Sequence, residues 1–222
     1  MNRFINALLL FLFLPTLALT VFVGFDLPFE PLRTTGSQLK YGEELFLILG
    51  LLLLVISLRR SIRRWMGMVL ILKLSKFKWN SPAGPDRIKR IWVYTVMEAL
   101  VFLFAAAALF RVTYQAWFPA TALAIVCLDN IFFLLIGSLK KGFRAGVTSK
   151  AVIMADRDVQ LAYFSGLRKV SIHQGSVYFD YIKDLQISFP LDAIAPEERE
   201  QFFEALNAQL DKDKVFVTIK RN

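Results

Sequence analysis

The chain has little of the chemistry on which most enzymes and metal proteins rely. Its 222 residues include one cysteine, Cys127, and one histidine, His173. A single cysteine forms no disulfide within the chain and no thiolate pair for a metal, and a lone histidine needs carboxylate help to hold one. The sequence also lacks a phosphate-binding glycine loop and an H-E-x-x-H zinc motif. We therefore expect no enzymatic activity, no catalytic residue, no metal and no cofactor.

Over most of the chain the numbers of basic and acidic residues are balanced. The net charge is +9, from 27 Lys and Arg against 18 Asp and Glu. Residues 59–90 hold ten basic side chains and one acid, so this segment accounts for the whole excess, whereas residues 145–222 hold ten basic and eleven acidic ones. A nucleic-acid-binding domain normally shows a basic face of its own. We therefore expect no nucleic-acid partner.

Hydrophobic residues, by contrast, are abundant. They make up 56% of the chain, which includes 21 Phe, whereas about 45–50% is usual in a soluble domain. The excess lies in four blocks before residue 139, and about 20 apolar residues are enough to cross the hydrocarbon core of a membrane. We predict four transmembrane helices, at about residues 5–25, 41–58, 91–110 and 118–138.

Two of these blocks leave alternatives open. The first, 5–25, follows a basic residue as in a signal peptide, but no A-x-A cleavage site comes after it, which favours an uncleaved span. The second is continuously apolar only over Leu45–Leu58, so it spans fully only by including residues 41–44 or by thinning the bilayer. Between the two, residues 26–44 have the prolines and mixed charges of an exposed connector.

The basic segment 59–90 also has two interpretations. Residues 65–74 and the lysines and aromatics after them are typical of an element lying in the membrane interface. Alternatively, this stretch continues the second helix beyond the membrane. The residues from Asn80 to Pro85 are expected to break any regular structure.

Orientation follows from the positive charges that flank the spans. Because Lys and Arg concentrate in segment 59–90 and just after the fourth span, the positive-inside rule places this segment and both termini in the cytoplasm. The same charges either recruit anionic lipid headgroups or merely set the topology. The residues that we expect to contact anionic lipid are Arg59, Arg60, Arg63, Arg64, Lys73, Lys76 and Lys78.

Three polar residues fall inside the predicted spans. Glu98 and Asp129 are both expected at about 10–13 Å from the inner boundary of the membrane, and Asn130 follows directly. Intramembrane carboxyl groups are costly and are often functional. We predict that Glu98, Asp129 and Asn130 form a polar cluster in which at least one carboxyl is protonated, because two like charges repel in a low dielectric. Three alternatives remain open: the cluster pairs helices, it forms part of an ion or proton pathway, or the helices turn the two carboxyl groups apart.

The pattern changes after the fourth span. We divide the chain into a membrane domain, residues 1–144, and a cytoplasmic domain, residues 145–222. The second domain shows short alternating segments typical of β-hairpins, then a helix that begins near Pro196 with acids in its first turn and one apolar face. The strands are expected at 147–154, 159–164, 169–174, 176–182 and 185–189. The helix is expected to close over the open side of the sheet.

This tail resembles the C-terminal domain of the YcxB-like family of bacterial membrane proteins, which are related to pleckstrin-homology (PH-like) proteins. The segments that carry the resemblance are Leu161–Phe164, Leu167–Ile172, Val177–Tyr181, Gln186–Pro190 and a helix from Glu197 through Leu206. The chain departs from the family pattern in lacking a Trp near Tyr163 and in adding a strand-like segment at 215–219. The resemblance implies a PH-like β-meander with a C-terminal capping helix, in a multi-pass protein of the bacterial cytoplasmic (inner) membrane. It carries no catalytic residues to transfer.

Three classes of function remain open from the sequence. The first is a membrane-anchored scaffold or sensory module whose C-terminal domain binds a protein partner or forms a homo-oligomer, and the absence of catalytic motifs favours it. The second is an oligomeric small transporter or channel that uses Glu98 and Asp129. The third is an enzyme acting on lipid, for which the sequence offers no clustered catalytic side chains.

Overall fold

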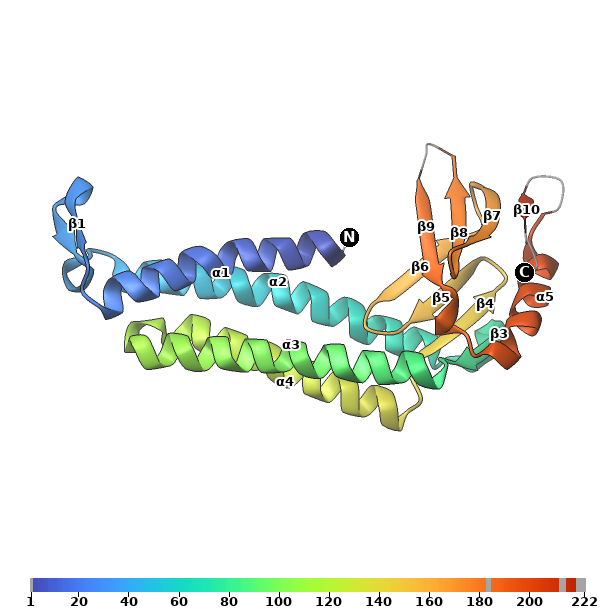
Figure 1. Cartoon of the computed structure of the whole chain (residues 1–222), viewed down its shortest axis with the longest axis horizontal. Helices are drawn as coiled ribbons and strands as arrows, with labels where there is room; N and C mark the ends of the chain where they lie inside the picture. Colours follow the sequence, from blue (N-terminus) through green and yellow to red (C-terminus); the bar gives the residue numbers. More distant parts are fainter. Residues whose placement is uncertain (1, 183–184, 212–214, 219–222) are drawn as a thin grey trace. The chain divides into compact units, whose positions relative to one another are not determined.

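The structure, a computed structural model, describes residues 2–182, 185–211 and 215–218 (Figure 1). The chain divides into two compact units. The helical unit comprises Met1–Ile62 and Tyr94–Phe133, and the β unit comprises Arg63–Val93 and Leu134–Asn222. This division differs from the predicted boundary after residue 144. The β unit takes in the segment between the second and third long helices, together with the helix ends on either side of it.

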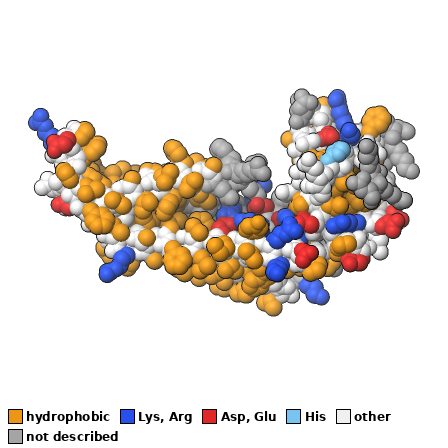
Figure 2. All heavy atoms as spheres, viewed as in Figure 1, with side chains coloured by type: hydrophobic (Ala, Val, Ile, Leu, Met, Phe, Trp, Pro, Cys, Tyr) orange, Lys and Arg blue, Asp and Glu red, His pale blue; other side chains and the backbone are white. Residues whose placement is uncertain are grey.

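Four helices among the described residues are long and apolar enough to cross a membrane. They are α1 (Asn2–Gly24), α2 (Gly42–Ile71), α3 (Pro85–Val112) and α4 (Trp117–Leu139). Hydrophobic side chains cover much of their visible surface (Figure 2). Each predicted span falls largely within one of these helices. The chain is therefore a membrane protein with a helical membrane part, as the sequence indicates.

Helix α2 is longer than predicted. It runs without interruption over 30 residues, about 45 Å at 1.5 Å per residue, which exceeds the roughly 30 Å of a hydrocarbon core. The expectation of a separate interfacial element at residues 65–74 is therefore wrong for residues up to Ile71, and the alternative of a continued helix holds. The reason is local: Arg and Leu are good helix formers, and no proline interrupts this stretch.

The core of the helical unit joins all four long helices. Its buried members include Leu9 from α1, Phe46 and Leu53 from α2, Leu109 from α3 and Leu123 from α4. Without a hydrophobic driving force between helices in lipid, such packing depends on close van der Waals contact. These contacts fix which faces of the helices meet.

The connector between α1 and α2 is folded. Strand β1 (Pro28–Phe29) pairs with β2 (Thr34–Thr35), a 3-10 turn joins the two, and a second 3-10 turn, Gly36–Gln38, follows. Asp26 closes this fold, since its Oδ1 accepts a hydrogen bond from the Ser37 backbone N–H at 2.7 Å. This hydrogen bond also lowers the pKa of the Asp26 carboxyl.

The remaining strands belong to the β unit, in two sheets. They are β3 (Phe77–Pro82), β4 (Arg144–Thr148), β5 (Ala151–Ala155), β6 (Val159–Tyr163), β7 (Leu167–His173), β8 (Ser176–Tyr181), β9 (Gln186–Pro190) and β10 (Phe216–Thr218). Within the described residues the strand orders are β3-β4-β5-β6 and β10-β7-β8-β9. Neighbouring strands are antiparallel except β10, which lies parallel to β7.

Strand β3 overturns one prediction. The residues from Asn80 to Pro85 were expected to break regular structure, yet Asn80, Ser81 and Pro82 pair with β4. Proline is tolerated there because β3 is an edge strand, where a missing N–H leaves no ladder bond unmade. The pairing partner lies more than 60 residues away in the chain, so local sequence gives no sign of it.

The prediction of the first strand of the C-terminal domain is also wrong. Residues 147–154 were expected as one strand, but β4 and β5 form a hairpin within this stretch. The turn is held by Thr148, whose Oγ1 accepts hydrogen bonds from the backbone N–H groups of Lys150 and Ala151 at 3.2 and 3.0 Å. A threonine turn of this kind carries no Gly or Pro signal.

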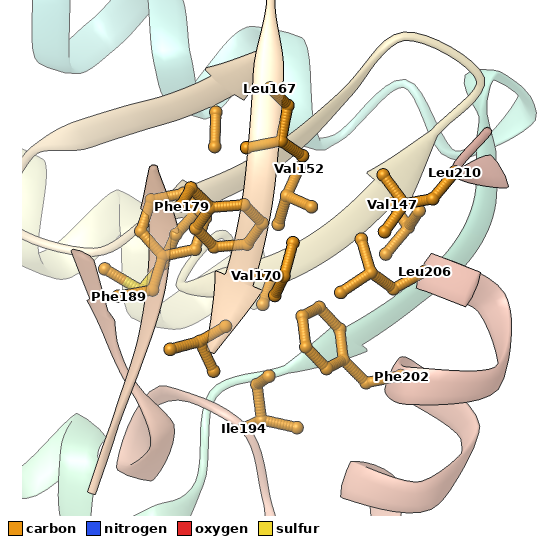
Figure 3. Close-up of a cluster of buried hydrophobic side chains, with 14 of the residues drawn as sticks. Val147, Val152, Leu167, Val170, Phe179, Phe189, Ile194, Phe202, Leu206 and Leu210 are labelled. Carbon is orange, nitrogen blue, oxygen red and sulfur yellow. The ribbon is translucent and has the colours of Figure 1, made fainter. Parts of the chain in front are cut away.

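The two sheets enclose one hydrophobic core, closed by a helix. Figure 3 shows Val170, Phe179 and Phe189 pointing toward the side chains of Phe202 and Leu206. The last two come from α5 (Arg199–Gln209), which begins after a 3-10 turn at Pro196–Glu198. All five side chains are buried. The prediction of a small α+β domain after the membrane helices is confirmed.

Strand β5 is buried on both faces. Val152 and Met154 face the main core, whereas Ile153 belongs to a second cluster with Ile71 at the end of α2. The end of α2 therefore covers the back of this sheet.

Candidate functional site

Polar side chains from α2, α3 and α4 lie close together in the helical unit. This polar network consists of Arg60, Ser61, Glu98, Asp129 and Asn130. Within it, Arg60 is 8% exposed and Asn130 is fully buried. Because burial of an unpaired charge or amide is costly, its members have to satisfy one another.

Glu98 on α3 lies between the other two helices. Its carboxylate forms an ion pair with the guanidinium of Arg60 on α2. Its Oε1 also accepts a hydrogen bond from Asn130 Nδ2 on α4 at 3.3 Å. One carboxylate thereby joins three helices.

Asp129 contacts a different partner. Its Oδ1 accepts a hydrogen bond from Ser61 Oγ at 2.7 Å. The structure therefore brings Asn130 next to Glu98, as the predicted cluster requires, and gives Asp129 a contact with α2.

The ion pair adds a positive charge that the predicted cluster did not include. Protonation of one carboxyl was expected because two carboxylates would repel each other. In the structure the Arg60 guanidinium pairs with Glu98, and protonation of a carboxyl in the cluster stays a prediction.

The burial of Arg60 and Arg64 corrects part of the expected lipid contact. Arg60 is paired with Glu98, and Arg64 is only 3% exposed. The two residues are four apart on a continuous helix and so share a face, which the shorter predicted helix did not reveal. Of the other predicted lipid contacts, Arg63 is half-buried, whereas Arg59, Lys73, Lys76 and Lys78 are exposed. The exposed four remain predicted lipid contacts.

Sequence reasoning missed Arg60 and Ser61 as members of the network. A signal was present, because Arg60 is a basic residue following a long apolar run and Glu98 is an acid within another. Only the continuation of α2 past Leu58, however, brings an arginine to the level of Glu98.

A second set of charges joins the start of α3 to the β unit. Arg87 pairs with Asp156, in the turn between β5 and β6, and its Nη1 lies 3.5 Å from Asp192 Oδ1. Arg90 Nη1 lies 2.7 Å from Asp192 Oδ2. Asp156 Oδ1 also accepts a hydrogen bond from the Asp158 backbone N–H at 3.1 Å. These carboxylates hold the first turns of α3 against two loops of the β unit.

Trp79 on strand β3 contacts two residues of the C-terminal helical segment. Trp79 Nε1 donates a hydrogen bond to Glu198 Oε2 at 3.3 Å, and its ring lies edge-on to Phe202 with centroids 5.2 Å apart. The segment between α2 and α3 and the C-terminal helix thus form one folded body.

One tyrosine of the β unit has a perturbed pKa. Tyr181 donates a hydrogen bond from its hydroxyl to the Tyr163 backbone carbonyl at 2.7 Å. Burial disfavours the charged phenolate and raises the pKa of Tyr181 to about 12.

Neither a metal site in the described part of the chain nor a known relative points to a function for this chain. Among the described residues no group of three or more His, Cys, Asp or Glu side chains is arranged to hold a metal ion. No protein-family model, curated protein or solved structure matches this chain.

Proposed function

We propose that this protein is a membrane-anchored scaffold or sensory module without enzymatic activity. In this proposal its β unit lies at the cytoplasmic side of a bacterial inner membrane, with both termini in the cytoplasm, and binds a protein partner or a second copy of the chain. The observation that carries the proposal is the way the β unit is built. It takes strands from two separate parts of the chain, and the spanning helices lead into them through residues 72–76, 83–84 and 140–143.

Such short connections tie binding to the membrane. A partner that docks on the β unit acts on a body continuous with α2, α3 and α4. Arg87 and Arg90 strengthen this link, since they hold the start of α3 to loops of the β unit. The arrangement suits a module that presents a binding surface at the membrane or passes a signal to its helices.

The surface that we assign to binding lies at one end of the two sheets. Tyr163, Ile182 and Leu185 expose 56%, 50% and 56% of their surface. Hydrogen bonds gather these residues: the Tyr181 hydroxyl donates to the Tyr163 carbonyl, the Tyr181 N–H donates to Leu185 O at 2.8 Å, and the Ile182 N–H donates to Gly166 O at 3.1 Å. Exposed apolar side chains that cluster in this way are typical of interaction sites.

The PH-like assignment is part of the proposal. Two four-stranded sheets among the described residues, a shared core and a C-terminal helix packed into it support a PH-like barrel. Exposed Lys73, Lys76 and Lys78 support contact with anionic headgroups, in addition to the predicted role of this segment in setting topology.

The alternative of a transporter or channel receives less support. A proton or ion pathway through Glu98 would need that carboxylate to change partners during transport. The structure engages it in an ion pair with Arg60 and a hydrogen bond from Asn130, which is the arrangement expected of a contact that holds helices together.

The test is native mass spectrometry of the full-length protein, extracted from the membrane of its own host. We expect a defined second copy or a stoichiometric protein partner on the wild-type chain. The double variant Ile182→Asp with Leu185→Asp should lose it, because both side chains are exposed and charges there oppose docking.

The matched control is Phe216→Asp, on β10 at the opposite edge of the same sheet, where the side chain is 76% exposed. This variant should keep the partner or second copy. Equal loss in both variants would contradict the assigned surface. A closed ring of identical subunits that survives every substitution would favour the transporter.

A further inference from the structure

The connector between α1 and α2 carries an open surface pocket, called the cavity below, outside the polar network and the β unit. Its volume is about 250 Å³, and its walls come from both strands of the β1–β2 hairpin, the 3-10 turn between them and Gln38. Charged side chains of both signs gather at this end of the helical unit (Figure 2). The connector thus carries a hollow lined by both polar and apolar side chains.

The backbone around the cavity is held in place. The Gly36 N–H donates to Leu27 O at 3.1 Å, and Asp26 holds the N–H of Ser37. A Cβ at Gly36 would lie 2.1 Å from Phe22 O, so the chain passes close against the end of α1. These contacts fix the shape of the hollow before any ligand arrives, which lowers the cost of binding.

Two opposite charges line the cavity, one on each side of the same short turn. Glu30 begins this turn, and Arg33 ends it in a left-handed conformation with φ 47°. Within the described part of the chain neither side chain is engaged in an ion pair, and both are exposed. The cavity therefore offers one carboxylate and one guanidinium to a ligand.

Uncharged groups complete the lining. Thr34, Thr35 and Gln38 bring hydroxyl and amide groups, and Phe29 brings a ring that is 46% exposed. Pockets for drug-sized molecules measure about 300–1,000 Å³, so this smaller hollow fits a small polar molecule or headgroup.

We propose that this cavity binds a small zwitterion. Its ammonium group lies against Glu30, and its carboxylate or phosphate lies against Arg33, whose planar fork of donors matches either anion. Phe29 contacts the short apolar link between the two charges. The same chemistry is found in a free amino acid and in the headgroup of phosphatidylethanolamine.

The experiment uses the full-length protein in nanodiscs of phosphatidylglycerol, which has no zwitterionic headgroup, with O-phosphoethanolamine and L-alanine as probes in isothermal titration calorimetry. We expect saturable binding of at least one probe by the wild-type chain. Glu30→Gln and Arg33→Gln should each weaken that binding at least tenfold. The controls Lys40→Gln and Glu43→Gln change charges of the same region that do not line the cavity, and should leave binding unchanged.

A charge-reversed variant tests whether the single variants lose binding only because they misfold. The double variant Glu30→Arg with Arg33→Glu keeps one charge of each sign in the cavity and should bind more tightly than either single variant. Absence of binding by the wild-type chain, or equal loss in variants and controls, would overturn the proposal.

A second set of nanodiscs identifies the source of the ligand. If phosphatidylethanolamine in the disc suppresses O-phosphoethanolamine binding, the headgroup is the ligand. If it has no effect and L-alanine binds, the ligand is a free amino acid.

Discussion

The helical unit buries several polar side chains beside its apolar ones, whereas the main core of the β unit is apolar. In the helical unit Thr20 and Asn130 are fully buried, whereas Phe104 is 69% exposed. In the β unit Phe179 and Leu206 are fully buried and lie among other apolar side chains. Lipid is as apolar as a core, so polar contacts have to be made between helices, whereas water drives apolar groups inside. Substitution of a buried residue should therefore destabilise the helical unit through a lost polar contact and the β unit through lost apolar packing.

The largest effect is expected from breaking the ion pair in the helical unit. Glu98→Leu leaves the Arg60 guanidinium buried without this counter-charge, and removal of one partner from a buried pair costs about 3–5 kcal/mol. Thermal unfolding of the purified protein in detergent measures the loss. The double variant Arg60→Met with Glu98→Leu removes both charges and should recover most of it. Equal destabilisation of the single and double variants would contradict the importance of the pair.

Truncation of a buried side chain in the β unit should lower the stability through lost packing alone. Leu206→Ala removes a fully buried side chain from α5 and should cost about 3 kcal/mol, through lost burial and the cavity left behind. Trp79 reports on this region because its ring contacts Phe202. Denaturant unfolding followed by tryptophan fluorescence should show an earlier transition. Glu204→Ala, on the exposed face of the same helix, is the control and should leave the midpoint nearly unchanged.

A smaller effect is expected at the second contact of the polar network. Ser61→Ala removes the hydroxyl that donates to Asp129, and hydrogen bonds between membrane helices contribute about 0.6 kcal/mol on average. A double-mutant cycle with Asp129→Asn measures the coupling between the two side chains. A coupling energy near zero would show that this contact adds nothing to the assembly of the helices.

The smallest effect depends on pH. The folded state raises the pKa of Tyr181 to about 12 from an ordinary value near 10, so folding favours the neutral phenol. The stability that Tyr181 contributes is fully present below pH 10 and is lost as pH rises through 12. The melting temperature of the wild-type chain should fall more steeply from pH 10 to pH 12 than that of Tyr181→Phe. Parallel curves would contradict the raised pKa.

The membrane helices follow closely from the sequence. Long apolar runs are local signals, and the predicted spans at 91–110 and 118–138 lie within α3 and α4. The error in α2 has a physical cause. A membrane helix does not end where its hydrophobic run ends, because Arg59 to Arg64 continue a helix as well as leucine does.

The β unit was predicted less completely. Most C-terminal strands show an alternating pattern, but β3 lies between two helices and pairs with residues more than 60 positions away. The hairpin of β4 and β5 was also missed, because Thr148 forms its turn without Gly or Pro. In both cases the missing information is a contact, which no local pattern contains.

The residues of the candidate site, too, were predicted only in part. Glu98, Asp129 and Asn130 stand out because polar residues are rare within apolar runs. Their partners Arg60 and Ser61 do not, since they begin a basic segment whose charge has an evident role in topology. Burial of Arg60 depends on which face of α2 meets α3.

The sequence by itself determined where the membrane helices lie, that positive charge concentrates in segment 59–90, and that an α+β domain follows. These properties depend on composition and on patterns within about 20 residues. The tertiary structure decided that β3 joins the C-terminal sheets, that Arg60 pairs with Glu98 and that the connector carries a surface pocket. Each of these requires residues distant in the chain, or a tightly closed loop, to meet in space, and such contacts form only when the whole chain has folded.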